Sequence, residues 1–124
     1  MLHKDYNAAD LAQLALASGT SATILAVADF SPGAWWGFNG VQSLILTADQ
    51  LFIVQKRFGG RAGRLRQSMS TGAIRRVDWT VQRRLGRESV SMTLTTEGRS
   101  QRYTSKWSNA SDFAELAAEQ RKAA

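Results

Sequence analysis

Arginine is the residue type of this sequence whose number and spacing could do chemistry, and that chemistry is electrostatic. Residues 55–107 hold 13 Lys and Arg against three acidic residues, a net charge of +10, whereas residues 1–54 carry −3. Such a field can steer acidic partners, membranes or nucleic acid toward the protein. Alternatively, it only maintains solubility and protects sheet edges from pairing. The arginines that we expect to form one continuous basic surface are Arg75, Arg83, Arg84, Arg87, Arg99 and Arg102.

A second candidate site is the aromatic cluster Trp35, Trp36 and Phe38, which lies among glycines in the segment 29–40, DFSPGAWWGFNG. Large aromatic rings on a loop either fold back against the rest of the domain or contact a partner chain or membrane interface. If the segment is extended, Trp36 and Phe38 share one face and Trp35 takes the other. We therefore expect at least one ring to be buried and at least one to be accessible as a partner anchor.

Residues suited to catalysis are few. The single histidine, His3, lies in the N-terminal tail, so a nucleophile-His-acid triad has no base and a His-based metal site cannot form. The chain has no cysteine, which excludes disulfides and thiolate metal sites. Four carboxylates fall near turns of different predicted hairpins, so their spacing does not indicate a catalytic pair. We expect a protein that is not an enzyme and that uses no cofactor or metal. These carboxylates are Asp29, Asp49, Glu88 and Glu97.

Short β-strands must position these residues. Two apolar, β-rich runs in the segment 41–58 meet at the polar turn 47–50 and predict a central hairpin. Period-two alternation and β-branched residues predict five more strands, and the glycine-rich segment 58–64 fits a hairpin turn because it lacks both phosphate-loop spacings. Strict alternation places Arg75 and Arg83 on the same face as Val77 and Trp79, a conflict with one basic surface. The five further strands are expected at residues 22–28, 64–71, 74–84, 89–96 and 100–107, and the first of them is expected to end before a turn at Ser31-Pro32-Gly33.

Two amphipathic segments flank the strands. Asn7 is a suitable N-cap for a short helix over about residues 8–18. A second helix is expected over about residues 109–122, with an apolar stripe at i, i+3 and i+4 and basic residues in its last turn. That stripe needs a surface to cover. The strand and helix residues that we expect to form this core are Trp79, Leu94, Phe113 and Leu116.

The chain length of 124 residues corresponds to a single domain, 1–124, with the barrel over about residues 21–107. The N-terminal sequence has acidic residues near or inside its apolar part, which argues against a secretory signal. No apolar run approaches the roughly 18–20 residues of a membrane span. We expect a soluble, cytoplasmic protein.

Seven antiparallel strands followed by one capping helix is the order of the pleckstrin-homology (PH) superfold, a bent sheet or partly open barrel. The segment 44–54, LILTADQLFIV, resembles the "lLTd.rl.fv" hairpin of bacterial PH-like domains, and 73–77, AIRRV, resembles their entry into the fifth strand. The resemblance covers roughly residues 20–120 and rests on hydrophobic register. It implies a mainly β (α+β) fold with a C-terminal capping helix and a noncatalytic binding module.

Lipid-binding members of that family carry lysines and arginines on and beside the loop between the first two strands. The corresponding segment here, 29–40, has neither residue, so no specific phosphoinositide is expected. The leading hypothesis is a PH-like module for protein-protein interaction with an unknown protein. The alternative is sequence-independent binding of nucleic acid or anionic lipid through the basic strand face. The salt dependence of binding distinguishes the two hypotheses, because binding to many phosphates weakens steeply as the salt concentration rises.

Overall fold

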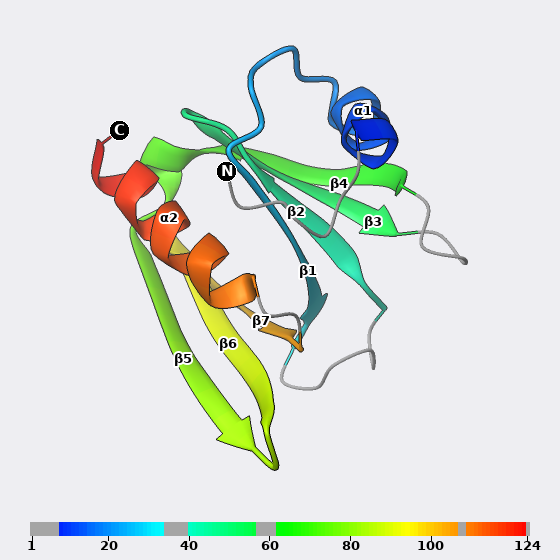
Figure 1. The fold of residues 1–124 in the computed structure, drawn as a ribbon. Coiled ribbons are helices and arrows are strands. Elements are labelled where there is room, and N and C mark those ends of the chain that lie inside the picture. Colours follow the sequence, from blue (N-terminus) through cyan, green and yellow to red (C-terminus); the bar gives the residue numbers. More distant parts are fainter. Residues whose placement is uncertain (1–7, 34–39, 57–61, 107–108, 124) are drawn as a thin grey trace.

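The computed structural model describes residues 8–33, 40–56, 62–106 and 109–123. Seven strands and two α-helices follow one another along the chain (Figure 1). Their bounds are α1 (Ala8–Ser18), β1 (Ala26–Pro32), β2 (Gln42–Leu46), β3 (Gln50–Lys56), β4 (Ala62–Ser70), a short 3-10 helix η1 (Thr71–Ala73), β5 (Arg76–Arg84), β6 (Arg87–Thr96), β7 (Arg99–Ser105) and α2 (Ala110–Ala123).

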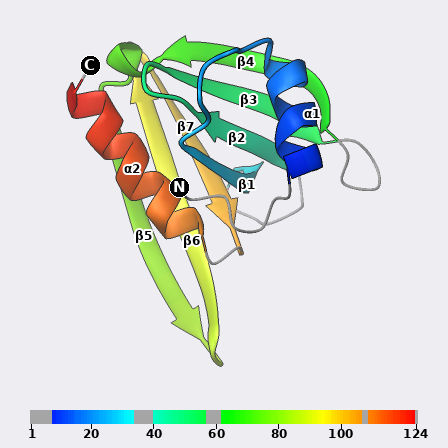
Figure 2. The ribbon, with the colours of Figure 1, turned by 45° about the horizontal axis from the view of Figure 1, so that its top comes forward.

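The strands form one antiparallel sheet in the order β4-β3-β2-β1-β7-β6-β5, so β4 and β5 are its edges within the described chain. Strand β1 joins the two halves, because Ala26 to Phe30 pair with β2 whereas Ser31 and Pro32 pair with β7. The sheet bends between these halves and does not close (Figures 1 and 2). The predicted fold class, a seven-stranded antiparallel bent sheet with a C-terminal helix and a short N-terminal helix, is confirmed.

The inner face of the bend holds the larger core, and α2 lies across it (Figure 1). Phe113 of α2 is fully buried, and its ring lies 5.7 Å from that of Phe30, centroid to centroid. The side-chain amide of Asn109, just before α2, donates to the carbonyl of Val27, 2.8 Å away. At the other end of α2, Arg121 donates to the carbonyl of Ile74. Hydrogen bonds therefore connect one end of α2 to β1 and the other end to the segment just before β5.

The outer face of the first half of the sheet has a separate core under α1 (Figure 2). Leu14 of α1 is 2% exposed and packs in a cluster with Val27, Ile45, Phe52 and Val54. Strands β1, β2 and β3 consequently bury apolar side chains on both faces. This explains why 51–54, Leu-Phe-Ile-Val, is a continuous apolar run instead of an alternating one.

Two sequence expectations need correction. The first strand was expected to end at residue 28, before a turn at Ser31, but β1 continues to Pro32 because Ser31 and Pro32 pair with β7. Trp79 was expected in the core with Leu94, Phe113 and Leu116, but its side chain is 36% exposed. The physical reason is that the β5–β6 hairpin extends beyond α2, so no element of the described chain covers that part of β5 (Figure 1). The other three residues lie in or against the inner core as expected.

Candidate functional site

The strands distribute the expected basic residues over two faces of the second half of the sheet. Val90 and Met92 point into the core, so the alternate positions of β6 face outward. Arg87 is one of these outward positions and is paired with Arg84, while Arg102 is paired with the outward Thr93. This outer group comprises Arg84, Arg87 and Arg102. All three are exposed.

The other three arginines lie elsewhere. Arg83 is on the face of Trp79, as alternation predicts, and is accommodated because the hairpin tip lies beyond the core; it pairs with Glu88, 3.4 Å away. Arg75 precedes β5 and lies 3.7 Å from Glu97. Arg99 begins β7 on the inner face, in line with Tyr103. Sheet pairing thus separates residues that are close in sequence.

The four carboxylates considered for catalysis have different surroundings. Asp29 lies within β1, where it accepts a hydrogen bond from Ser43 at 2.8 Å and pairs with Lys56. Glu88 and Glu97 each pair with a different arginine, and Asp49 accepts from Thr47 in the turn between β2 and β3. Among the described residues, no three His, Cys, Asp or Glu side chains form a cluster that could hold a metal ion. The geometry gives these carboxylates structural partners.

The expected partner anchors Trp35, Trp36 and Phe38 lie outside the described residues, as does His3. Other apolar side chains are exposed in the described part. On the inner face of β5, Trp79 is 36% and Val81 41% exposed. Leu85, at the tip of the β5–β6 hairpin, is fully exposed and has a positive φ of 51°, which is uncommon for a leucine.

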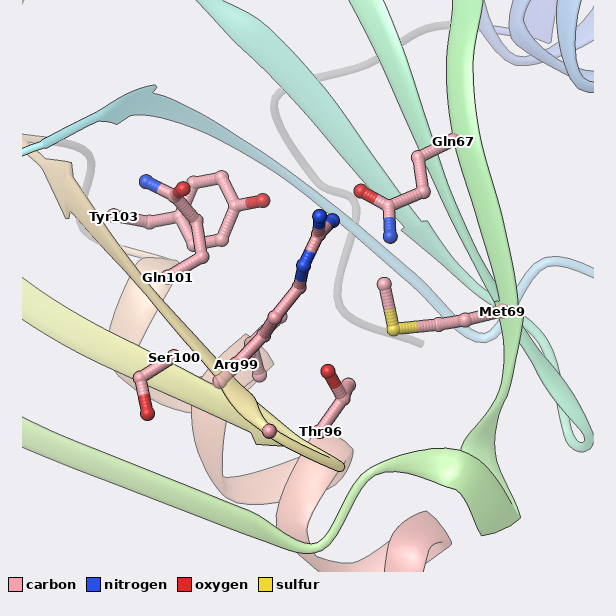
Figure 3. Close-up of a pocket in the computed structure, with 9 residues that line it drawn as sticks. Gln67, Met69, Thr96, Arg99, Ser100, Gln101 and Tyr103 are labelled. Atoms are coloured by element: carbon pink, nitrogen blue, oxygen red, sulfur yellow. The ribbon is translucent and has the colours of Figure 1, made fainter.

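A cavity of about 480 Å³ lies on the inner side of the bend, between β4 and the β6–β7 turn. Figure 3 shows Gln67 and Met69 reaching into it from β4 while Arg99 and Tyr103 reach in from β7. Its size falls within the roughly 300–1,000 Å³ of small-molecule sites. Sequence patterns predicted Arg99 as a site residue but did not predict which residues surround it in the fold. Period-two alternation groups Arg99 with Gln101 and Tyr103, yet β4 is far from β7 in sequence.

Comparison with known proteins yields no assignment: no protein-family model matches the chain, and no curated protein matches it. None of the helices in the described part of the chain is long and apolar enough to cross a membrane. Three surfaces remain for functional interpretation: the exposed edge of β5, the outer group of arginines and the cavity beside β4.

Proposed function

We propose that the protein is a noncatalytic interaction module of the PH-like kind, and that it binds an extended segment of another protein along β5. The observation that carries this proposal is the free edge of β5 with exposed apolar side chains beside α2. The order β4-β3-β2-β1-β7-β6-β5, with a helix across the inner face of an open sheet, supports the PH-like interpretation.

Strand β5 has the features required for strand addition. In the described sheet it pairs with β6 on one side and with no strand on the other, so its second edge can bond a further strand. An extended peptide there would gain main-chain hydrogen bonds, and alternate side chains would determine specificity. Trp79 and Val81 offer apolar contact on the face turned toward α2. Trp79 is the natural anchor, because tryptophan is enriched among binding hot spots.

The charge of β5 selects the kind of segment. The strand holds Arg76, Arg83 and Arg84. Arg76 pairs with Asp78 at 2.7 Å and Arg83 pairs with Glu88 of β6 at 3.4 Å, whereas Arg84 has no carboxylate partner among the described residues. A partner segment with apolar residues at alternate positions and acidic residues between them complements this strand. The proposed ligand is therefore an acidic, extended protein segment.

A second candidate function is binding of anionic lipid or nucleic acid through the outer group of arginines. The observation that favours it is that, within the described residues, Arg84, Arg87 and Arg102 form no ion pair with a carboxylate; Arg102 donates instead to Ser91, 2.8 Å away. Three exposed cations on one face can contact phosphates without first breaking a salt bridge.

Selection from a display library of random linear peptides tests the main proposal. Peptides recovered by the protein should be acidic and alternately apolar, and Trp79→Thr should weaken their binding about tenfold or more. Arg102→Gln, on the outer face, is the matched control and should leave the affinity for these peptides within about threefold. Selection of no peptide class, or equal binding by the Trp79 variant, would contradict the proposal.

Two further sets of variants test the alternative function and the role of the aromatic segment. A variant with Arg84, Arg87 and Arg102 all changed to Gln should lose salt-sensitive binding to anionic vesicles or DNA if the alternative holds.

Alanine at Trp35, Trp36 and Phe38, each in turn, tests the expected partner anchor. A folded variant that no longer binds the selected peptide would identify an anchor ring, whereas damage to stability alone would make the segment structural.

A further inference from the structure

One wall of the cavity between β4 and the β6–β7 turn is formed by the side chain of Tyr103. Tyr103 is 4% exposed and packs edge-on against Phe30, with ring centroids 6.2 Å apart. Its phenolic oxygen points into the cavity (Figure 3) and makes no hydrogen bond to any described residue. The oxygen is therefore open to the cavity and can form a hydrogen bond to water or to a ligand there.

The phenol of Tyr103 is neutral at physiological pH, as in any ordinary tyrosine, and burial raises its pKa further, to about 12. A neutral phenol can donate its hydrogen to an acceptor in the cavity. The cavity therefore presents a permanent donor on its β7 side.

Arg99 supplies a cation to the same space. Figure 3 shows its side chain extending between Tyr103 and Gln67, and within the described chain its guanidinium has no carboxylate partner. None of the nine described residues that line the cavity is acidic. The planar guanidinium presents paired N–H groups that match a carboxylate. Gln67, from β4, adds a neutral amide donor on the opposite wall.

The remaining lining is apolar. Leu94 is 4% exposed, and Met69 is half-buried against the inner core. Together with the Tyr103 ring, these side chains form an apolar wall next to the donors. One cation and neutral donors balance a single negative charge, and the apolar wall suits a hydrocarbon body of the same ligand.

We propose that this cavity is a binding site for a monocarboxylate with an apolar body, held by Arg99, Tyr103 and Gln67 against Leu94 and Met69. The carboxylate can belong to a free organic acid or to the C-terminal residue of a peptide, since both present the same group. This site is distinct from the edge of β5 and does not depend on the proposed peptide binding there.

Amide resonances recorded during titration with millimolar ligand test the site. The free-acid probes are hexanoate and phenylacetate, and the peptide probe is a short peptide that ends in leucine; the control for each is its amide. The acids should shift the resonances of residues 94–103 and 67–69, whereas the amides should bind at least about tenfold more weakly, because a charged hydrogen bond is lost. Which arm binds identifies the source of the carboxylate.

Substitutions assign the contacts. Arg99→Gln should weaken acid binding about tenfold or more and Tyr103→Phe by at least about threefold, whereas Arg84→Gln, which removes the same charge from the outer face, should have no effect. If Tyr103→Phe does not fold, Arg99→Gln alone decides, because Arg99 is exposed. Absence of shifts at these residues with every acid, equal binding of the amides, or unchanged binding by Arg99→Gln would overturn the proposal.

Discussion

Strands β3 and β5 have similar lengths but opposite surroundings. In β3, residues 51–54 are all buried, because α2 and the inner core lie on one face and α1 on the other. In β5, the side chains are exposed except for the half-buried Val77, even though three residues of the strand are apolar. The side chains of the central strand are therefore buried in the two cores, whereas the edge strand leaves apolar and charged groups exposed.

The difference arises from neighbours and not from β-propensity alone. Both strands are rich in β-branched and aromatic residues, which suit a pleated surface. Strand β3 has a hydrogen-bonded strand on either side, while β5 is at the edge and extends past the end of α2. Substitutions at buried residues, compared with substitutions at exposed residues, test this contrast.

The largest expected effect is at the centre of the inner core. Phe113→Ala should lower the free energy of unfolding by about 3–5 kcal/mol, because a fully buried ring in contact with Phe30 is replaced by a cavity. Urea denaturation followed by tryptophan fluorescence measures it. A loss below about 1 kcal/mol would mean that α2 is not docked as described.

The outer core provides the next test. Leu14→Ala should lower the free energy of unfolding by about 2–4 kcal/mol, since the side chain of Leu14 is 2% exposed on the sheet-facing side of α1. Leu16, on the same helix and 83% exposed, is a matched control, and Leu16→Ala should change stability by less than about 0.5 kcal/mol. Equal effects of the two substitutions would contradict the packing of α1 on the outer face.

Alkaline pH probes the wall of the cavity. The pKa of Tyr103 rises from 10.0 to about 12 on burial, so the folded protein holds this proton more tightly than the unfolded chain. Tyr103 contributes a constant amount below about pH 10, and stability falls between about pH 10 and 12 by roughly 1.4 kcal/mol per unit.

Unfolding free energies of the protein and of Tyr103→Phe, measured across this pH range, isolate the contribution of that phenol. The variant should have a shallower decline with pH, because its ring cannot ionise. Parallel declines in both proteins would show that the phenol ionises as readily in the folded protein as in the unfolded chain.

The smallest expected effect is at Val81, on the exposed edge strand. Val81 and Val90 face each other across β5 and β6, yet Val81 is 41% exposed and Val90 is fully buried. Val81→Thr should change stability by less than about 0.5 kcal/mol. Val90→Thr should cost about 1–3 kcal/mol, because it buries a hydroxyl. Thermal unfolding of the two variants provides the comparison, and a larger loss from Val81→Thr would show that β5 is covered in solution.

Much of the fold follows from the sequence, because local signals and tertiary packing agree there. The apolar hairpin around residues 47–50 and the α1 bounds of 8–18 match the structure, and the C-terminal helix starts within one residue of its expected position. The alternation of Val90, Met92 and Leu94 correctly identifies their shared buried face. These features depend on residues close in sequence, where periodicity alone defines the buried side.

Other features depend on tertiary structure and cannot be derived from periodicity. Whether Trp79 is covered depends on how far α2 reaches along β5, and whether Ser31 is in a turn or a strand depends on β7, more than 60 residues away in the chain. The cavity likewise exists only because the bend brings β4 opposite β7, which places Gln67 across from Arg99 and Tyr103. Local sequence defines which face of a strand is apolar, but only the arrangement of distant elements determines which of those faces is buried and which is left exposed.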